Sequence, residues 1–135
     1  MSLNRNIKPL TVRVSRGFGL IELMIAVVIV GILSTIAYPS YITYVKRTNE
    51  AEAQGQMMEL AGALEAYRAK NFSYAGASLS SLSPSLEKTK HYTVVLNLGA
   101  NNQSFTINAT PSTSSMSGMP SLSLTSSGVA SWENN

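Results

Sequence analysis

The stretch that decides the fold reads RGFGLIELMIAVVIVGILSTIAYPSY and covers residues 16–41. From Phe18 to Tyr38 it runs for 21 residues, among which Glu22 is the only charged one. A helix of this length measures about 30 Å, which is the thickness of the hydrocarbon layer of a bilayer. Apolar residues would occupy every side of it, as lipid or a packed helix bundle requires. We therefore predict a transmembrane or bundle-core helix over residues 18–45.

Positive charge is distributed unevenly around this apolar run. Residues 1–17 carry four bases and no acid, whereas the remaining residues carry six bases and seven acids. The heavier positive flank predicts an N-terminus in the cytoplasm and an exported domain over residues 46–135. Because much of the net charge of +3 lies in the first 17 residues, it does not argue for nucleic-acid binding.

Three simpler interpretations compete for the apolar run. A cleavable secretory signal has a shorter apolar core followed by a small-x-small site, and here such a site occurs only at Ala51-Glu52-Ala53. A plain signal anchor fits the length but leaves Gly17 and Glu22 unexplained. A buried core helix is disfavoured by the uninterrupted length and the charged flanks.

Glu22 is the unusual residue of the run. An ionised carboxylate near the middle of a bilayer costs roughly 2–3 kcal/mol or more, so such groups are usually paired. A cut between Gly17 and Phe18 would create an amine at position 18, one helical step from Glu22. The amine of a neighbouring chain, shifted along the axis, could pair equally well. The alternative is a glutamate that stays hydrated among the headgroups.

Beyond the run, the pattern predicts an α+β domain. Apolar residues recur at helical spacing from Tyr41 to about residue 69, so we predict one long, broken helix over residues 18–69. Gly55 and Gly62 weaken that helix unless a partner packs closely over them. Alternating apolar residues then predict four antiparallel strands, with the first two forming a hairpin; the ranges are 91–98, 104–110, 121–125 and 129–132.

The residues Arg16-Gly17-Phe18-Gly19-Leu20-Ile21-Glu22 resemble the prepilin leader junction of type IV pilins and pseudopilins. The resemblance implies a leader over residues 1–17, removed by a prepilin peptidase between Gly17 and Phe18. It also implies that Phe18 becomes N-methylated and that Glu22 aligns an incoming subunit by meeting the Phe18 amine of a neighbour. The stretch from Gly31 to Pro39 resembles the segment that loosens inside the filament, since glycine and proline both weaken a helix.

The domain after the run resembles, more narrowly, minor pilins of the PilE type. This resemblance implies an extracellular pilus subunit present in minor amounts, with roles in assembly, motility and adhesion. The partners implied are other pilin subunits, the prepilin peptidase, the inner-membrane assembly machinery and, before assembly, membrane lipid. Many pilins also carry a C-terminal disulfide, at the places that Met119 and Ser131 occupy here.

Other functions remain as alternatives or are argued against. A pseudopilin of a type II secretion system is one alternative, although that family uses acidic loop ligands for calcium and this chain has no aspartate. A DNA-binding tip pilin is another, but His91 with Lys88 and Lys90 is the only basic cluster of the domain, so nucleic acid is disfavoured. With no cysteine and one histidine, we expect no enzyme activity, no cofactor and no metal.

Overall fold

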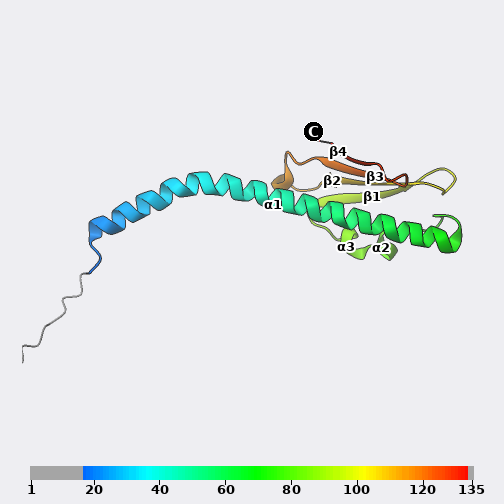
Figure 1. Ribbon diagram of the computed structural model, residues 1–135, viewed down its shortest axis with the longest axis horizontal. Coiled ribbons are helices and arrows are strands. Elements are labelled where there is room, and N and C mark those ends of the chain that lie inside the picture. The colour runs from blue at the N-terminus through cyan, green and yellow to red at the C-terminus, as the bar shows by residue number, and fades with distance from the viewer. Residues whose placement is uncertain (1–16, 134–135) are drawn as a thin grey trace, which may run out of the picture. The chain divides into compact units, whose positions relative to one another are not determined.

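The structure is a computed structural model that describes residues 17–133, apart from the side chain of Glu133. It divides into two compact units, Met1–Tyr38 and Pro39–Asn135. The elements follow the chain in the order shown in Figure 1: α1 (Leu20–Asn71), α2 (Leu79–Leu82), α3 (Pro84–Glu87), β1 (Tyr92–Leu98), β2 (Phe105–Pro111), the 3-10 turn η1 (Ser114–Met116), β3 (Ser121–Thr125) and β4 (Ala130–Glu133).

The four strands form one antiparallel sheet in the order β1-β2-β3-β4. Its register pairs Leu96 with Ile107 and Leu124 with Ala130, so each strand keeps one face towards the core. The turn between β1 and β2 contains Asn102 at φ 52°, and the turn between β3 and β4 contains Gly128 at φ 79°. Both lie in the left-handed region that asparagine and glycine tolerate best, which explains why these residues close the hairpins.

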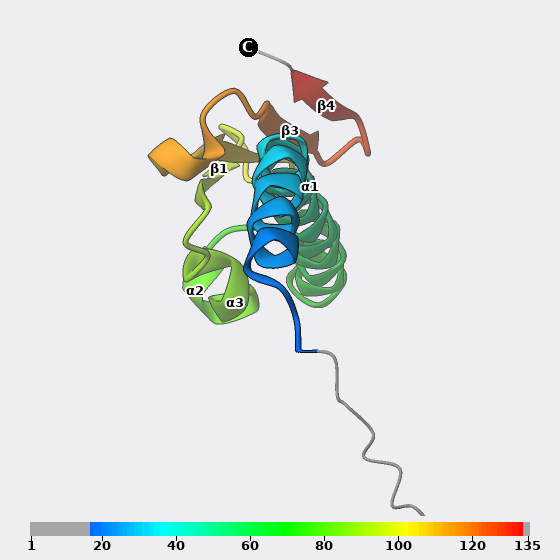
Figure 2. The ribbon, with the colours of Figure 1, turned by 90° about the vertical axis from the view of Figure 1, so that its left-hand side faces the viewer.

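The core of the second unit lies between the sheet and the later part of α1. Figure 2, which looks along the helix, shows the sheet on one side of α1 and the short helices α2 and α3 on another. The helix contributes four buried residues at helical spacing, namely Ala53, Met57, Leu60 and Leu64. The sheet contributes its alternating residues, which are Tyr92, Phe105, Ile107, Ala109, Leu122 and Leu124. This burial of apolar surface is the main force that holds the head together.

One polar group is built into this core at the C-terminal end of α1. Tyr74 is fully buried and donates its hydroxyl to Glu65 Oε1 at 2.6 Å. Its ring meets Phe105 edge to face at 5.1 Å, and the Arg68 guanidinium lies 5.5 Å from the ring centre. Burial, with the hydrogen bond to Glu65, raises the pKa of this tyrosine. The α1–α2 connection is thereby fixed onto the helix that it leaves.

The predicted α+β fold is confirmed, including the first hairpin and the four strands, whose ends shift by about one residue. In this structure α1 is continuous through Gly31 and Pro39, and the predicted loosening of this stretch inside a filament stays a prediction. Proline removes one backbone hydrogen bond, and a long helix retains the others on both sides. The predicted domain boundaries at residues 17 and 45 stay predictions.

No residue packs closely over Gly55 or Gly62 within the described part of the chain. Both residues are exposed, and a Cβ built on either would meet nothing within 4 Å. The two glycines therefore weaken the helix without allowing any close packing within this chain.

Gly62→Ala should stabilise the protein by roughly 0.5–1 kcal/mol, because alanine favours the helix and the new methyl group meets open space. Chemical denaturation of the detergent-solubilised chain, followed by the fluorescence of Trp132, measures the change. Gly128→Ala is the matched control, and it should destabilise by about 1–2 kcal/mol because its φ is 79°. An unchanged or lower stability in Gly62→Ala would contradict the assignment of open space.

Tyr92→Phe should remove part of the loss of stability at high pH. Burial, with the nearby Glu50 carboxylate, raises the pKa of Tyr92 from 10.0 to about 12. The folded state therefore keeps this proton at pH values where the unfolded state loses it. The contribution of protonated Tyr92 to the free energy of unfolding is thus fully present below pH 10 and is lost as the pH rises through about 12. Unfolding of wild type and variant across this range tests the effect. Tyr44→Phe, which alters an exposed ring, is the control. If the free energy of unfolding falls equally steeply with pH in all three proteins, the prediction for Tyr92 is refuted.

Candidate functional site: the amino-terminal assembly segment

The junction predicted for cleavage lies just before α1. Gly17, Phe18 and Gly19 have no regular secondary structure, and the Phe18 side chain is 77% exposed. The peptide bond between Gly17 and Phe18 is thus outside the helix, where a peptidase can bind it as extended chain. The rest of the predicted leader, residues 1–16, lies outside the described residues.

Glu22 closes the N-terminal end of α1 onto its own backbone. Its Oε2 accepts a hydrogen bond from the Gly19 N–H at 2.5 Å, while the Gly19 carbonyl accepts the first helical bond from Leu23 N at 3.2 Å. Gly19 is therefore the N-cap and Glu22 the N3 residue of half a capping box. The carboxylate also lies where the helix dipole favours negative charge. In the uncut chain, the partner of Glu22 is a backbone amide.

The first part of α1 exposes its apolar side chains on all sides. Leu20, Val27 and Ile36 are 78%, 67% and 68% exposed, and an 18-residue window of α1 has a mean hydropathy of 2.6 with none of its residues buried. Length and composition make it a candidate membrane span. Two shallow hollows of about 200 and 360 Å³ along this segment are lined only by apolar residues, which are Leu20, Leu23, Met24, Ile25, Val27, Val28 and Ile29. Such a surface fits lipid chains or the side chains of another apolar helix.

The hydroxyl groups within the apolar run bond to their own helix. Ser34 Oγ donates to the Val30 carbonyl and Thr35 Oγ1 to the Ile32 carbonyl, each at 2.7 Å. They therefore add little polarity to the surface of the segment. Beyond the run, Thr43 Oγ1 donates to the Pro39 carbonyl at 3.1 Å. Gly31 has open space around it, so its missing side chain would let another helix approach closely.

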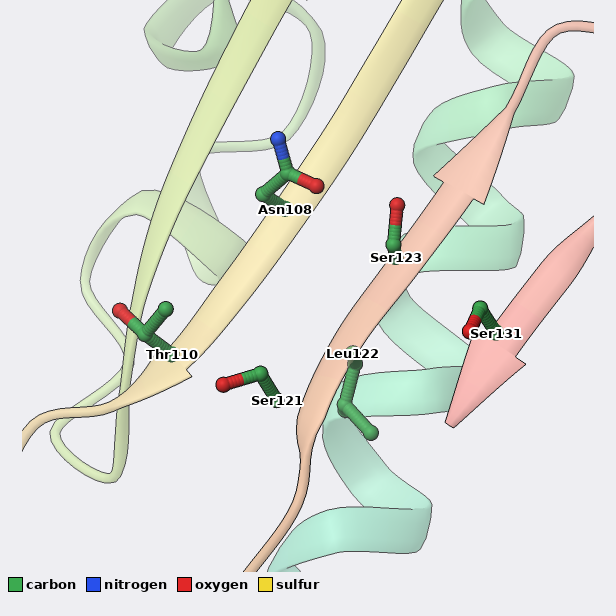
Figure 3. Close-up of a pocket in the computed structure, with 6 residues that line it drawn as sticks. All are labelled: Asn108, Thr110, Ser121, Leu122, Ser123 and Ser131. Atoms are coloured by element: carbon green, nitrogen blue, oxygen red, sulfur yellow. The ribbon is translucent and has the colours of Figure 1, made fainter. Parts of the chain in front are cut away.

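A polar hollow of about 370 Å³ lies on the outer face of the sheet of the head (Figure 3). It is lined by hydroxyl and amide side chains from β2, β3 and β4, together with Leu122; the polar residues are Asn108, Thr110, Ser121, Ser123 and Ser131. The lining contains no acid, base or histidine that could transfer a proton. The described residues also contain no group of three or more side chains suited to hold a metal ion.

The structure separates the two positions at which a C-terminal disulfide was expected by resemblance. Met119 packs against the hydrophobic core, whereas Ser131 lines the hollow on the outer face of the sheet. The two side chains thus point into different surroundings and would not form a bridge without a change in the backbone. The C-terminal part of this head is held instead by strand pairing between β3 and β4.

Comparison with known families identifies both parts of the chain. The profile of the prokaryotic N-terminal methylation motif matches residues 12–38. A second profile, described as the type IV minor pilin ComP, DNA uptake sequence receptor, matches residues 39–119, more than half of the chain. The chain belongs to the ComP family of type IV minor pilins. The resemblance to type IV pilins is thereby confirmed.

Curated relatives of this pilin match over shorter stretches. The type IV major pilin PilA of Myxococcus xanthus is 39% identical over 61 residues, which are 45% of this chain and 28% of that protein. The type II secretion system core protein G of Pseudomonas aeruginosa is 37% identical over 62 residues, 46% and 44% of the two chains. Fimbrial protein EcpC of Eikenella corrodens is 54% identical over 41 residues, 30% and 27% of the two. The chain spans less than half the length of each of these relatives.

A solved structure supports the fold of this pilin. The non-core minor pilin PilV of Neisseria meningitidis aligns with a TM-score of 0.57, covering 68% of this chain and 90% of that one. Their sequences are only 17% identical, so the likeness establishes the pilin fold and nothing narrower.

The role of Gly19 was missed from the sequence. The signal was available, because a small N-cap residue followed three positions later by glutamate is the capping-box spacing. A side chain at position 19 would contact the Glu22 carboxylate, which would have to move.

Two substitutions at Glu22 should separate the cap from the charge. Glu22→Gln keeps a side-chain acceptor for the Gly19 amide, so hydrogen exchange at that amide should stay slow. Glu22→Ala removes the acceptor and should speed exchange several-fold at Gly19, with little change at Leu60 in the head. Nuclear magnetic resonance of the uncut chain in detergent micelles measures both. Equal exchange at Gly19 in the two variants would contradict the capping role.

Proposed function

We propose that this minor pilin is a structural subunit of a type IV pilus, present in minor amounts and active in pilus assembly, motility and adhesion. It enters the bacterial inner membrane as a single-pass prepilin with its N-terminus in the cytoplasm. A prepilin peptidase cuts it between Gly17 and Phe18, and the Phe18 amine is methylated. The assembly machinery of the inner membrane then moves it into the extracellular filament. Its role is association with other pilins and involves no catalysis.

The observation that carries this proposal is the exposed apolar part of α1, which lies within the residues that match the methylation motif. Exposure of this apolar surface to water is unfavourable. The methylation motif supports a sequence of states in which lipid surrounds the surface first and other pilin helices pack against it afterwards. Cutting after Gly17 leaves a helix that begins almost at its first residue, with Gly19 at the cap. The whole apolar segment then becomes available for packing.

Glu22 is proposed to exchange partners during assembly. In the uncut chain it accepts from the Gly19 amide, and this bond satisfies the carboxylate only partly. Once the cut creates a charged amine at Phe18, a charge-assisted pair with the amine of a neighbouring subunit becomes available in a medium of low dielectric constant. That pair would set the axial position of the incoming subunit. Gly31 to Pro39 is the stretch proposed to loosen in the filament.

Replacing Glu22 by its uncharged isostere tests this mechanism in cells. Glu22→Gln preserves the helix cap but carries no negative charge to pair with a charged amine, so the amount of this pilin in sheared filaments should fall at least tenfold while its membrane level stays constant. Glu59→Gln, at an exposed position of α1 in the head, is the matched control and should incorporate normally. Normal incorporation of Glu22→Gln would overturn the proposed role of the charge.

A second candidate function is recognition of DNA during uptake. It is favoured by the family profile over residues 39–119, whose description names a DNA uptake sequence receptor. The charge of the head does not by itself favour it, because residues 46–135 hold six bases and six acids. The relatives from pili and from a secretion system match this chain over similar lengths and at similar identity. These matches therefore do not favour the secretion alternative over the pilus.

Gel retardation with the purified chain in detergent tests the DNA candidate. Duplex DNA from the producing organism and unrelated duplex DNA of equal length are compared at low salt, where phosphate contacts are strongest. Preferential retardation of the organism's own DNA would support a receptor role. Unretarded DNA of both kinds would eliminate it without affecting the structural role in the pilus.

A further inference from the structure

Four cations of the head gather at the end where the chain arrives from the apolar run. We name Lys46, Arg47, Lys88 and Lys90 the basal cations. Lys46 and Arg47 lie on α1, and Lys88 and Lys90 lie between α3 and β1. Arg47, Lys88 and Lys90 are exposed, and Lys46 is half-buried.

Hydrogen bonds through the loop after β2 bring the two pairs to one end of the head. Ser112 donates its amide to the His91 carbonyl at 3.0 Å and its hydroxyl to the Lys90 carbonyl at 2.9 Å. Five residues further along the same loop, the Ser117 carbonyl accepts a hydrogen bond from Lys46 Nζ at 2.7 Å. The loop containing η1 thus joins the start of β1 to the start of the helical part of the head (Figure 1).

Lys70 lies at the opposite end of the head. There α1 ends next to the β1–β2 turn, as shown by Tyr74 N donating to the Asn102 carbonyl at 2.9 Å and Gln103 Nε2 donating to the Phe72 carbonyl at 3.1 Å. Lys70 is exposed and therefore provides an internal reference for any measurement on Lys88 and Lys90.

The basal cations outnumber the acidic residues that share their end of the head. Among the side chains that the structure describes, no ion pair is recorded for the basal cations. Three acidic residues share this end. Glu50 accepts from Gln54 Nε2 at 3.1 Å and lies near buried Tyr92, Glu87 is exposed beside Lys88, and Glu133 pairs with Ser121 at the start of β3. Four cations against three acidic residues leave a net charge of +1 at this end.

A polar hollow of about 420 Å³ adjoins this end of the head. It lies along one side of α1 and is lined by Pro39, Ser40, Thr43, Tyr44 and Arg47. The Tyr44 phenol and the Arg47 guanidinium offer donors that a phosphate oxygen accepts, and arginine can bind two such oxygens at once. The lining contains no carboxylate that would repel an anion.

We propose that the basal cations bind the anionic phospholipid headgroups of the membrane that anchors this chain, and so hold the head against the bilayer before assembly. The inference rests on the proposed function, since it requires the membrane-anchored state. Lipid is favoured over other anions because Lys46 follows Tyr38, the end of the apolar run, by only eight residues. The attachment keeps the cations near the headgroups, within or close to the Debye length of about 8–10 Å over which surface charge acts.

Amine labelling of the full chain in vesicles tests the proposal. The protein is reconstituted into vesicles of phosphatidylcholine alone and into vesicles of equal parts phosphatidylcholine and phosphatidylglycerol. A membrane-impermeant amine reagent is applied, and mass spectrometry measures the labelling of Lys88 and Lys90 relative to Lys70. The ratio should be about fivefold lower in the anionic vesicles and should recover at about 1 M salt, where the Debye length is near 3 Å.

A charge variant separates headgroup binding from a general effect of the vesicle. Arg47→Gln removes one basal cation and leaves both reporter lysines in place, so it should weaken the protection of Lys88 and Lys90. Lys70→Gln, which removes an exposed cation from the opposite end, should leave the absolute protection of these lysines unchanged. Equal protection in wild type and Arg47→Gln would overturn the assignment to the basal cations.

The remaining outcomes distinguish this inference from the proposals before it. Equal labelling in both kinds of vesicle, with the chain firmly inserted in each, overturns headgroup binding and leaves the pilin role intact. A chain that is extracted from vesicles by alkaline carbonate overturns the membrane anchor and this inference with it. Protection of Lys88 and Lys90 by duplex DNA in neutral vesicles, without protection in anionic ones, would assign the basal cations to nucleic acid instead.

Discussion

The apolar surface at the start of α1 is the constraint on which the rest of this structure depends. Along this segment large aliphatic side chains face outward on every side, and none of the hydropathic window is buried within the chain. The head has its own closed core. A chain built in this way can exist in a bilayer or in a bundle with other helices, and conversion between these two states is what assembly of a pilin requires.

Glu22 is the one charged residue of this apolar segment. A carboxylate among exposed aliphatic residues is costly, and the helix reduces that cost by placing it at the N3 position, near the Gly19 amide and the positive end of the helix dipole. The same location sets it a short distance from the amine that cleavage would create at Phe18. Capping, which the structure shows, and the proposed subunit registration are therefore compatible uses of one side chain. The head, by comparison, is built from a helix that packs on a sheet around an apolar core.

The sequence was sufficient for most of the fold. Apolar residues alternate along each strand, and Ala53, Met57, Leu60 and Leu64 recur at helical spacing, so both periodicities could be identified directly. The junction from Gly17 to Glu22 was likewise recognisable, because it combines a glycine, an aromatic residue and an acid at fixed positions before a long apolar run. These features depend on local spacing, which a single sequence displays.

Features that depend on tertiary contacts could not be predicted in this way. The separation of Met119 from Ser131 depends on which way the chain turns before β3. The hydrogen bond from Lys46 to the Ser117 carbonyl connects residues 71 apart in the sequence, and no periodic pattern predicts such a contact.

Mass spectrometry of sheared surface filaments tests the central claim most directly, namely that cleavage and assembly transfer the apolar helix from lipid to other pilins. The account predicts that this chain is present in the filaments in small proportion, that its first residue is Phe18, and that its amine is methylated. Filaments that lack the chain, or a chain that retains residues 1–17 wherever it is found, would contradict the account.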